Sequence, residues 1–181
     1  MNSGNTVNIL LNVEAMGLKI TWKLIYLGLN GMDDCKMLSH AELLEFIDSK
    51  LTVMSRQTDR FIKLLNEERE DRAISILLEF AETDGSDEFV QKRKWRVYKL
   101  KRLLDNPSED SLQGALELME FWSQNDITND CPQIFPTTEG VLAVKTYFTP
   151  QMYTSMTNAN KAWLLQEIEN INVVERAYLF Y

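Results

Sequence analysis

The sequence has few of the residues on which most catalytic and metal sites depend. It contains one histidine, His40, and two cysteines, Cys35 and Cys131, which lie far apart and form no CxxC pair. These are too few for a Cys/His zinc site, which takes four ligands. The glycines form neither GxGxxG nor GxxxxGK, and no GxSxG or HExxH motif occurs. We therefore expect no cofactor, no metal and no catalytic residue.

The chain also has too little positive charge for nucleic-acid binding to be its main activity. Its 181 residues include 19 Lys and Arg against 27 Asp and Glu, which gives a net charge of -8. This charge disfavours nucleic acid and anionic membranes as partners and is compatible with a basic protein partner. The N-terminus lacks the positive start of a signal peptide, and no apolar stretch is long enough to cross a membrane. We expect a cytoplasmic protein.

Apolar residues recur at helical spacing through nearly the whole chain, and no convincing strand alternation occurs after residue 20. The pattern predicts an all-α fold of seven to nine helices in a single domain over residues 1–181. The arrangement is either an irregular multi-helix bundle or a stack of helical hairpins. Residues 6–16 fit a helix or a strand, and we favour the helix.

The longest clean helix is predicted over residues 87–105, where Val90, Val97, Leu100 and Leu104 share one face. The Asn-Pro pair that follows ends it, because the residue before a proline avoids the α region.

Trp95 lies nearly opposite Val97 on this helix, at 100° per residue. Either it belongs to a second layer of core or it contacts a binding partner. The buried position is favoured because Trp is highly buried on average.

Capping signals place the helix boundaries. Thr21 is predicted to begin a helix that ends at Asn30-Gly31, and Ser39 with Glu42 forms a capping box. The other predicted starts and stops are Asp71, Ser108 or Ser111, Thr137 or Thr138, Pro150 as a breaker, and Asn158 as the cap of the last helix.

Seven residues at the core-facing positions of these helices are predicted to be buried. They are Trp22, Leu44, Leu78, Val97, Leu100, Leu116 and Leu164.

Charge is distributed unevenly around the 87–105 helix, which carries seven of the 19 basic residues. Residues 105–139 carry eight carboxylates and no Lys or Arg, and they include the aperiodic loop 124–137. These acids either neutralise the basic helix or face a basic partner. In the second case the predicted partner-binding residues are Glu117, Glu120, Asp126 and Asp130, together with Trp95.

The densest carboxylate cluster is Glu67, Glu68, Glu70 and Asp71. Paired carboxylates can bind a divalent ion. No histidine and no calcium-binding type of loop accompanies these four, so we favour a solvated turn whose acids complement the start of the next helix.

The segment ITWKLIYLGL at residues 20–29 resembles the opening of a family of small bacterial proteins known only as a domain of unknown function. Some members of that family are immunity partners of LXG-type polymorphic toxins. The pair Lys94-Trp95 and the leucine-rich helix from Leu112 are similar in order. The resemblance implies a cytosolic antitoxin that neutralises a toxin by binding it, a role that needs no catalytic residue.

We therefore weigh three functions. The first is an immunity protein that binds a cognate toxin, with a nuclease as the favoured kind, because nuclease sites are basic and an acidic protein can imitate their substrate. The second is a helical adaptor or regulator that binds another protein or a peptide. The third, least favoured, is an enzyme that uses carboxylates and a metal.

Overall fold

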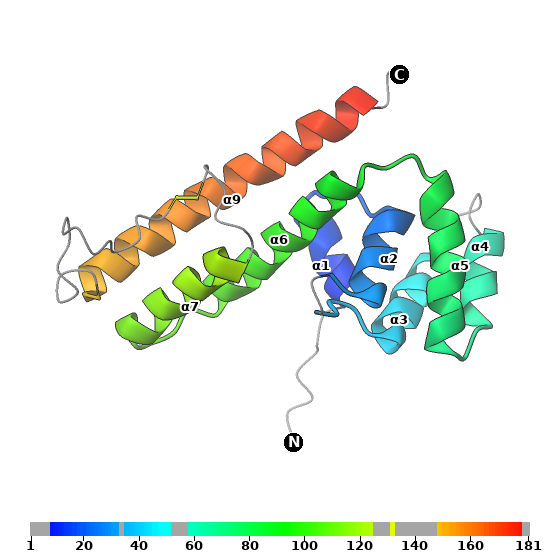
Figure 1. Cartoon of the computed structure of the whole chain (residues 1–181), viewed down its shortest axis with the longest axis horizontal. Coiled ribbons are helices and arrows are strands. Elements are labelled where there is room, and N and C mark those ends of the chain that lie inside the picture. The colour runs from blue at the N-terminus through cyan, green and yellow to red at the C-terminus, as the bar shows by residue number, and fades with distance from the viewer. Residues whose placement is uncertain (1–7, 33–34, 52–57, 125–130, 133–147, 179–181) are drawn as a thin grey trace. The chain divides into compact units, whose positions relative to one another are not determined.

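The computed structural model describes residues 8–32, 35–51, 58–124, 131–132 and 148–178. Within these ranges the chain forms eight α-helices and no β-strand, which confirms the all-α prediction (Figure 1). The helices are α1 (Ile9–Ala15), α2 (Trp22–Asn30), α3 (His40–Leu51), α4 (Thr58–Leu65), α5 (Glu70–Thr83), α6 (Glu88–Asp105), α7 (Ser111–Gln124) and α9 (Pro150–Tyr178).

The helices gather into two compact units, residues 1–95 (unit 1) and 96–181 (unit 2). Unit 1 contains α1 to α5 and the first part of α6, and unit 2 contains the rest of α6 with α7 and α9. One continuous helix therefore belongs to both units. The single domain over residues 1–181 stays a prediction.

The predicted caps in the first half of unit 1 are confirmed. Thr21 Oγ1 accepts a hydrogen bond from Leu24 N at 3.1 Å, and Gly31, at a φ of 98°, ends α2. Ser39 and Glu42 form the capping box, because Ser39 Oγ accepts from the backbone N–H of Glu42 at 3.2 Å and the Glu42 carboxylate accepts from that of Ser39 at 2.9 Å. The favoured helix near the N-terminus is α1.

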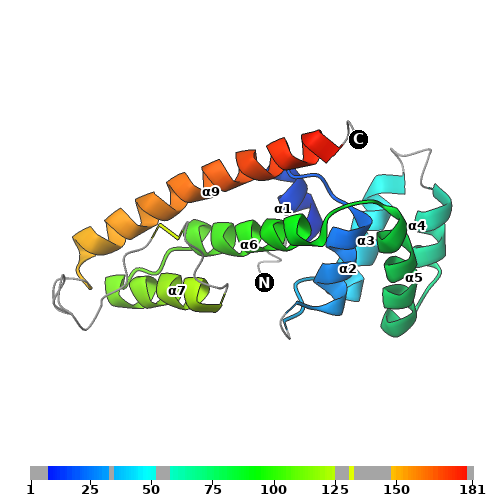
Figure 2. The ribbon, with the colours of Figure 1, turned by 45° about the horizontal axis from the view of Figure 1, so that its top comes forward.

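An aromatic group holds unit 1 together. The helix α2 packs against α5 and α3, and α3 also contacts α1 and α4 (Figure 2). The Trp22 ring centroid lies 5.4 Å from that of Phe61 and 5.1 Å from that of Phe80, and all three rings are buried. Tilted and edge-on pairs at these distances add about 0.5–1.5 kcal/mol each beyond the burial of their surface. Trp22 is therefore a core residue, as predicted.

Trp95 of α6 is fully buried in unit 1. Its indole Nε1 donates to Leu24 O at 2.9 Å. The ring lies against Gly28, where an added Cβ would come within 2.4 Å of the Trp95 Cζ2 atom. The absence of a side chain at Gly28 is what lets the ring approach α2 this closely. The second-layer position is confirmed, and Trp95 as a partner-contacting residue is wrong, because the indole is fully buried within the chain itself.

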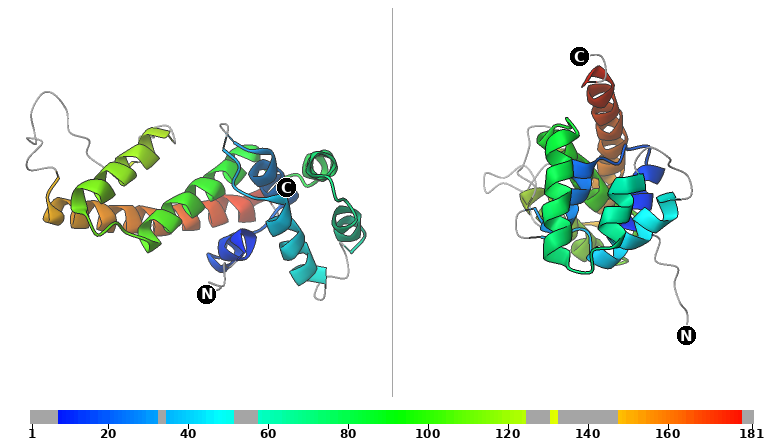
Figure 3. Two further views of the ribbon diagram at one scale, coloured as in Figure 1. Left: turned by 90° about the horizontal axis from the view of Figure 1, so that it is seen from below. Right: turned by 90° about the vertical axis from the view of Figure 1, so that its right-hand side faces the viewer.

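In unit 2, α7 packs against α9 (Figure 3). Trp122 is fully buried; its Nε1 donates to Asn160 Oδ1 at 2.7 Å, and its ring centroid lies 4.9 Å from that of Trp163. Asn160 is also buried, and its Nδ2 donates to Met156 O at 2.8 Å. Both ends of the amide are thus satisfied, as burial of a polar side chain requires.

The predicted start of the last helix is wrong. The helix α9 begins at Pro150 and runs through Asn158, which was expected to cap it. Proline is tolerated in the first turn because its missing N–H would have no helical partner there. Thr149 supplies the cap instead, since its Oγ1 accepts from Met152 N at 3.2 Å.

Two other predicted boundaries shift by one residue. The helix α5 begins at Glu70 rather than Asp71. The cap of α7 is Asp110 rather than Ser108 or Ser111, because Asp110 Oδ1 accepts from Gln113 N at 2.9 Å. The predicted helix after residue 137 lies outside the described residues.

Most of the predicted core is confirmed, and the errors have one cause. Trp22, Val97, Leu100 and Leu164 are buried and Leu44 is half-buried, whereas Leu78 and Leu116 are 40% and 44% exposed. The buried faces of α5 and α7 are set by Ala73, Ala81, Gly114 and Ala115 with a few large residues. Leu78 and Leu116 lie off those faces, because small residues let neighbouring helices approach and so mark the packed side.

The contact between Gly28 and Trp95 predicts an unusual result for a glycine in a helix. Gly28→Ala should destabilise the protein by about 1–3 kcal/mol through overpacking, although alanine is the better helix former. Urea unfolding of Gly28→Ala, of Trp95→Phe and of the double variant would measure this. In the Trp95→Phe background, where the ring is smaller, Gly28→Ala should cost less stability than in the parent. The same cost of Gly28→Ala in both backgrounds would contradict the contact.

Leu100 provides a test of the α6 core face. It is fully buried, so Leu100→Ala should lower the free energy of unfolding by about 2–5 kcal/mol. Leu165 on α9 is 70% exposed, so Leu165→Ala should change the free energy of unfolding by no more than about 0.5 kcal/mol. Equal effects of the two substitutions would mean that the buried face of α6 is wrongly assigned.

Candidate functional site

The outward side of α7 carries both carboxylates and exposed leucines. Leu112 and Leu116 are 47% and 44% exposed, Glu120 is exposed and Glu117 is half-buried. These four residues, called the α7 face below, point away from the side of the helix that buries Leu118 and Trp122. The α7 face therefore combines apolar surface with two negative charges on one rigid element.

The two carboxylates of the α7 face have neutral partners. Gln113 Nε2 donates to Glu117 Oε1 at 2.9 Å, and Gln124 Nε2 donates to Glu120 Oε1 at 2.9 Å. No Lys or Arg occurs in α7, and within the described ranges neither carboxylate forms an ion pair. Their hydrogen bonds hold the side chains in place without neutralising them.

The cations of α6 find partners elsewhere. Lys92 pairs with Glu88 at 2.8 Å, Lys101 with Asp105 at 2.7 Å, and Arg96 with Glu167 at 3.0 Å. Lys94 is fully buried, and its Nζ donates to Lys19 O at 2.6 Å. Of the acids in 105–139 that the structure describes, Asp105 alone pairs with the basic helix. Glu117 and Glu120 therefore form no direct ion pair with α6 among the described residues.

The predicted partner-binding residues are only partly brought together. Glu117 and Glu120 lie on one helical face, Trp95 is buried in unit 1, and Asp126 and Asp130 lie outside the described residues. Sequence reasoning missed Leu112 as an exposed residue and placed Leu116 in the core. The signal that could have found them is the Gly114-Ala115 pair, which marks the packed side of α7 and leaves both leucines off that side.

In the carboxylate cluster at the start of α5, two of the four acids form surface ion pairs. Asp71 accepts two hydrogen bonds from the Arg69 guanidinium, at 2.7 and 3.1 Å, and Glu70 pairs with Lys36. The hydrogen bond from Arg69 lowers the pKa of Asp71 below its ordinary value. In the part of the chain that the structure covers, no three His, Cys, Asp or Glu residues are grouped so that they could hold a metal ion.

Comparison with protein families identifies a relationship over most of the chain. Residues 11–171 match the family described as an uncharacterized protein conserved in bacteria, DUF2247. The chain belongs to this family. The family description names no activity, so the function of this DUF2247 protein has to be argued from its surfaces. Comparisons with curated proteins and with solved structures found no match. Among its described helices, none is both long and apolar enough to cross a membrane.

The different settings of three glutamates lead to a stability prediction. Glu117→Gln with Glu120→Gln should change the free energy of unfolding by less than about 0.5 kcal/mol, because both carboxylates bond neutral glutamine side chains and support no ion pair. Glu167 is 3% exposed and pairs with Arg96, so Glu167→Gln should cost on the order of 1–3 kcal/mol. Thermal or urea unfolding of the double variant and of Glu167→Gln would measure both effects. A large loss of stability in the double variant would mean that Glu117 and Glu120 stabilise the fold.

Proposed function

We propose that this protein is an immunity protein that binds and neutralises a cognate bacterial toxin through the α7 face. The observation that carries the proposal is a pair of carboxylates held by glutamines, without a cation, beside two exposed leucines. A fold that needed these acids for its own neutrality would pair them with Lys or Arg. Their arrangement suits an external positive partner instead.

The α7 face has the composition of an interface centre and its rim. Leu112 and Leu116 are one helical turn apart and offer adjacent apolar side chains that a partner pocket can enclose. Glu117 and Glu120 lie beside them, where charge sets orientation and association rate more than affinity. Apolar anchors would supply the binding energy and the acids would select a basic partner.

A nuclease toxin fits this chemistry best. Nuclease active sites are basic because they must hold phosphates, and carboxylates on a rigid helix can occupy the positions of those phosphates. The net charge of -8 on this chain adds long-range attraction to such a partner. The resemblance of residues 20–29 to a family with immunity members supports a toxin over other basic proteins.

The test uses the product of the adjacent gene as the candidate toxin. We expect the protein to co-purify with it and to rescue cells from its toxicity. Glu117→Lys with Glu120→Lys should slow association by about tenfold or more at low salt, and by less as salt rises, because steering is screened over a Debye length of roughly 10 Å at 0.1 M. Stopped-flow mixing and a plating assay measure the two effects.

A matched charge reversal controls for net charge. Glu45 and Asp48 on α3 are also exposed acids three residues apart, so Glu45→Lys with Asp48→Lys changes the net charge equally at another place. It should leave most of the association rate and all of the protection intact.

Leu112→Ala with Leu116→Ala should instead raise the dissociation rate. Unchanged binding and protection in both α7 variants would remove this face from the interface, and stable binding to a non-toxic product would favour the helical adaptor.

A further inference from the structure

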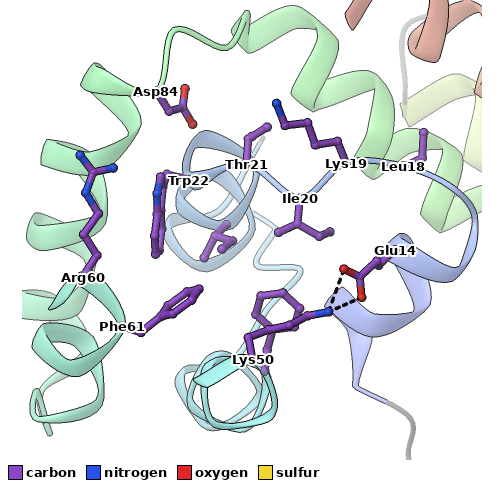
Figure 4. Close-up of a pocket in the computed structure, with 12 residues that line it drawn as sticks. Glu14, Leu18, Lys19, Ile20, Thr21, Trp22, Lys50, Arg60, Phe61 and Asp84 are labelled. Carbon is purple, nitrogen blue, oxygen red and sulfur yellow. Dashed lines mark hydrogen bonds and ion pairs between the residues drawn. The ribbon is translucent and has the colours of Figure 1, made fainter. Parts of the chain in front are cut away.

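A second, chemically different surface lies wholly inside unit 1. A pocket of about 460 Å³ opens between the connection from α1 to α2, the helices α3 and α4, and the end of α5 (Figure 4). Small-molecule sites in proteins have volumes of this order and are mostly apolar, with a few polar groups that fix orientation. The pocket is large enough for a ligand of ten or more heavy atoms.

The wall of the pocket is aromatic and aliphatic. Trp22 and Phe61 line one side, and the rest of the apolar surface comes from Leu18, Ile20, Ile25 and Phe46. Figure 4 shows Trp22 and Phe61 on the same side of the opening, with Arg60 next to them on α4. A flat or branched apolar group entering the pocket would therefore meet ring faces and edges, against which it packs favourably.

Both acids of the pocket are already compensated. Glu14 pairs with Lys50 at 2.6 Å. Asp84 Oδ2 accepts from Lys23 N at 2.8 Å, and its Oδ1 accepts from Ser86 N at 2.8 Å. These bonds direct the two carboxylates toward protein donors rather than toward a ligand.

Two cations of the pocket have no acid partner within the described residues. They are Lys19 and Arg60. The Arg60 guanidinium lies over the Phe80 ring at 4.9 Å and makes one long contact to Thr83 Oγ1 at 3.5 Å. The cation–π contact with Phe80 uses none of the guanidinium donors, and Arg has five N–H groups, so donors are left for a ligand.

We propose that this pocket binds a small organic carboxylate with an aromatic or branched apolar body. The carboxylate would take paired hydrogen bonds from Arg60, and the body would pack on Trp22 and Phe61. A phosphate is a poorer fit because two backbone donors at the N-terminus of α2 are already taken, one of them by a carboxylate: Thr21 caps Leu24 N and Asp84 takes Lys23 N. The proposal is independent of toxin binding, since α7 contributes nothing to the pocket.

The test titrates the full chain with 3-phenylpropionate and follows the amide and indole signals by NMR. We expect saturable shifts at millimolar concentrations, centred on Trp22, Phe61 and Arg60. The neutral 3-phenylpropanamide should bind about tenfold more weakly or worse, because it lacks the charge that Arg60 recognises. Shifts spread over both units, or equal binding of acid and amide, would overturn the proposal.

Variants of α4 sharpen the test. Arg60→Gln should weaken binding of the acid by about tenfold without changing that of the amide, and Arg60→Lys should fall between, because it keeps the charge and loses the paired donors. Lys63→Gln removes the same charge from the same helix at a residue outside the pocket lining, and should bind like the parent. Circular dichroism first establishes that each variant is folded.

If Arg60→Gln proves unstable, Lys19→Gln serves in its place, with a smaller loss expected from this more exposed cation. Full binding in every cation variant would show that the pocket does not select an anion. An acetylated tripeptide with a C-terminal phenylalanine that bound far more tightly than the free acid would identify a chain terminus as the ligand, and so overturn the small-molecule assignment.

Discussion

The approach of Trp95 to Gly28 is the constraint on which unit 1 depends. A helix as rich in Lys and Arg as α6 enters a core only if its buried side chains have partners. Trp95 donates to Leu24 O, Lys94 to Lys19 O, and the buried Gln91 accepts from Thr21 Oγ1 at 2.9 Å. All three bonds end on α2 or on the connection before it. Gly28 makes them possible by letting α2 lie against the indole ring, and the position of Trp22 follows from that of α2.

This use of α6 has a consequence for the acids of the chain. Lys92 and Lys101 pair within α6, Arg96 pairs with α9, and Lys94 bonds a backbone carbonyl, so none of these four cations pairs with Glu117 or Glu120. A basic helix followed by an acidic one suggests mutual neutralisation when only the sequence is read. The structure separates the two, because salt-bridge partners are chosen by helix packing and by spacing within a helix rather than by proximity in the sequence.

The parts of the fold that could be predicted are those set by local chemistry. The Ser39–Glu42 capping box, the Thr21 cap and the Val97–Leu100 face of α6 each depend on residues within one or two turns.

The predictions that were wrong depend on neighbours distant in sequence. Helical spacing places Leu78 and Leu116 on apolar faces, yet which side of α5 or α7 is buried is decided by the alanines and glycines that admit another helix. Arg60 was missed altogether, because its place beside Trp22 depends on how α4 packs in unit 1.

The two proposed surfaces require opposite charges from one acidic protein, and their physics differs accordingly. The α7 face works with the overall field: a net charge of -8 attracts a basic partner from a distance, and Glu117 and Glu120 only focus that attraction.

The pocket works against the same field, which repels an anion approaching it. At physiological salt that repulsion decays over about 8 Å, so it slows entry more than it weakens the bound state. Once inside, a carboxylate meets Arg60 in partly desolvated surroundings, where a paired charge is worth more than in water. The apolar wall of Trp22 and Phe61 must then supply most of the affinity. Selectivity at the pocket should therefore follow the shape of the ligand's apolar body, whereas selectivity at α7 should follow the charge of the partner.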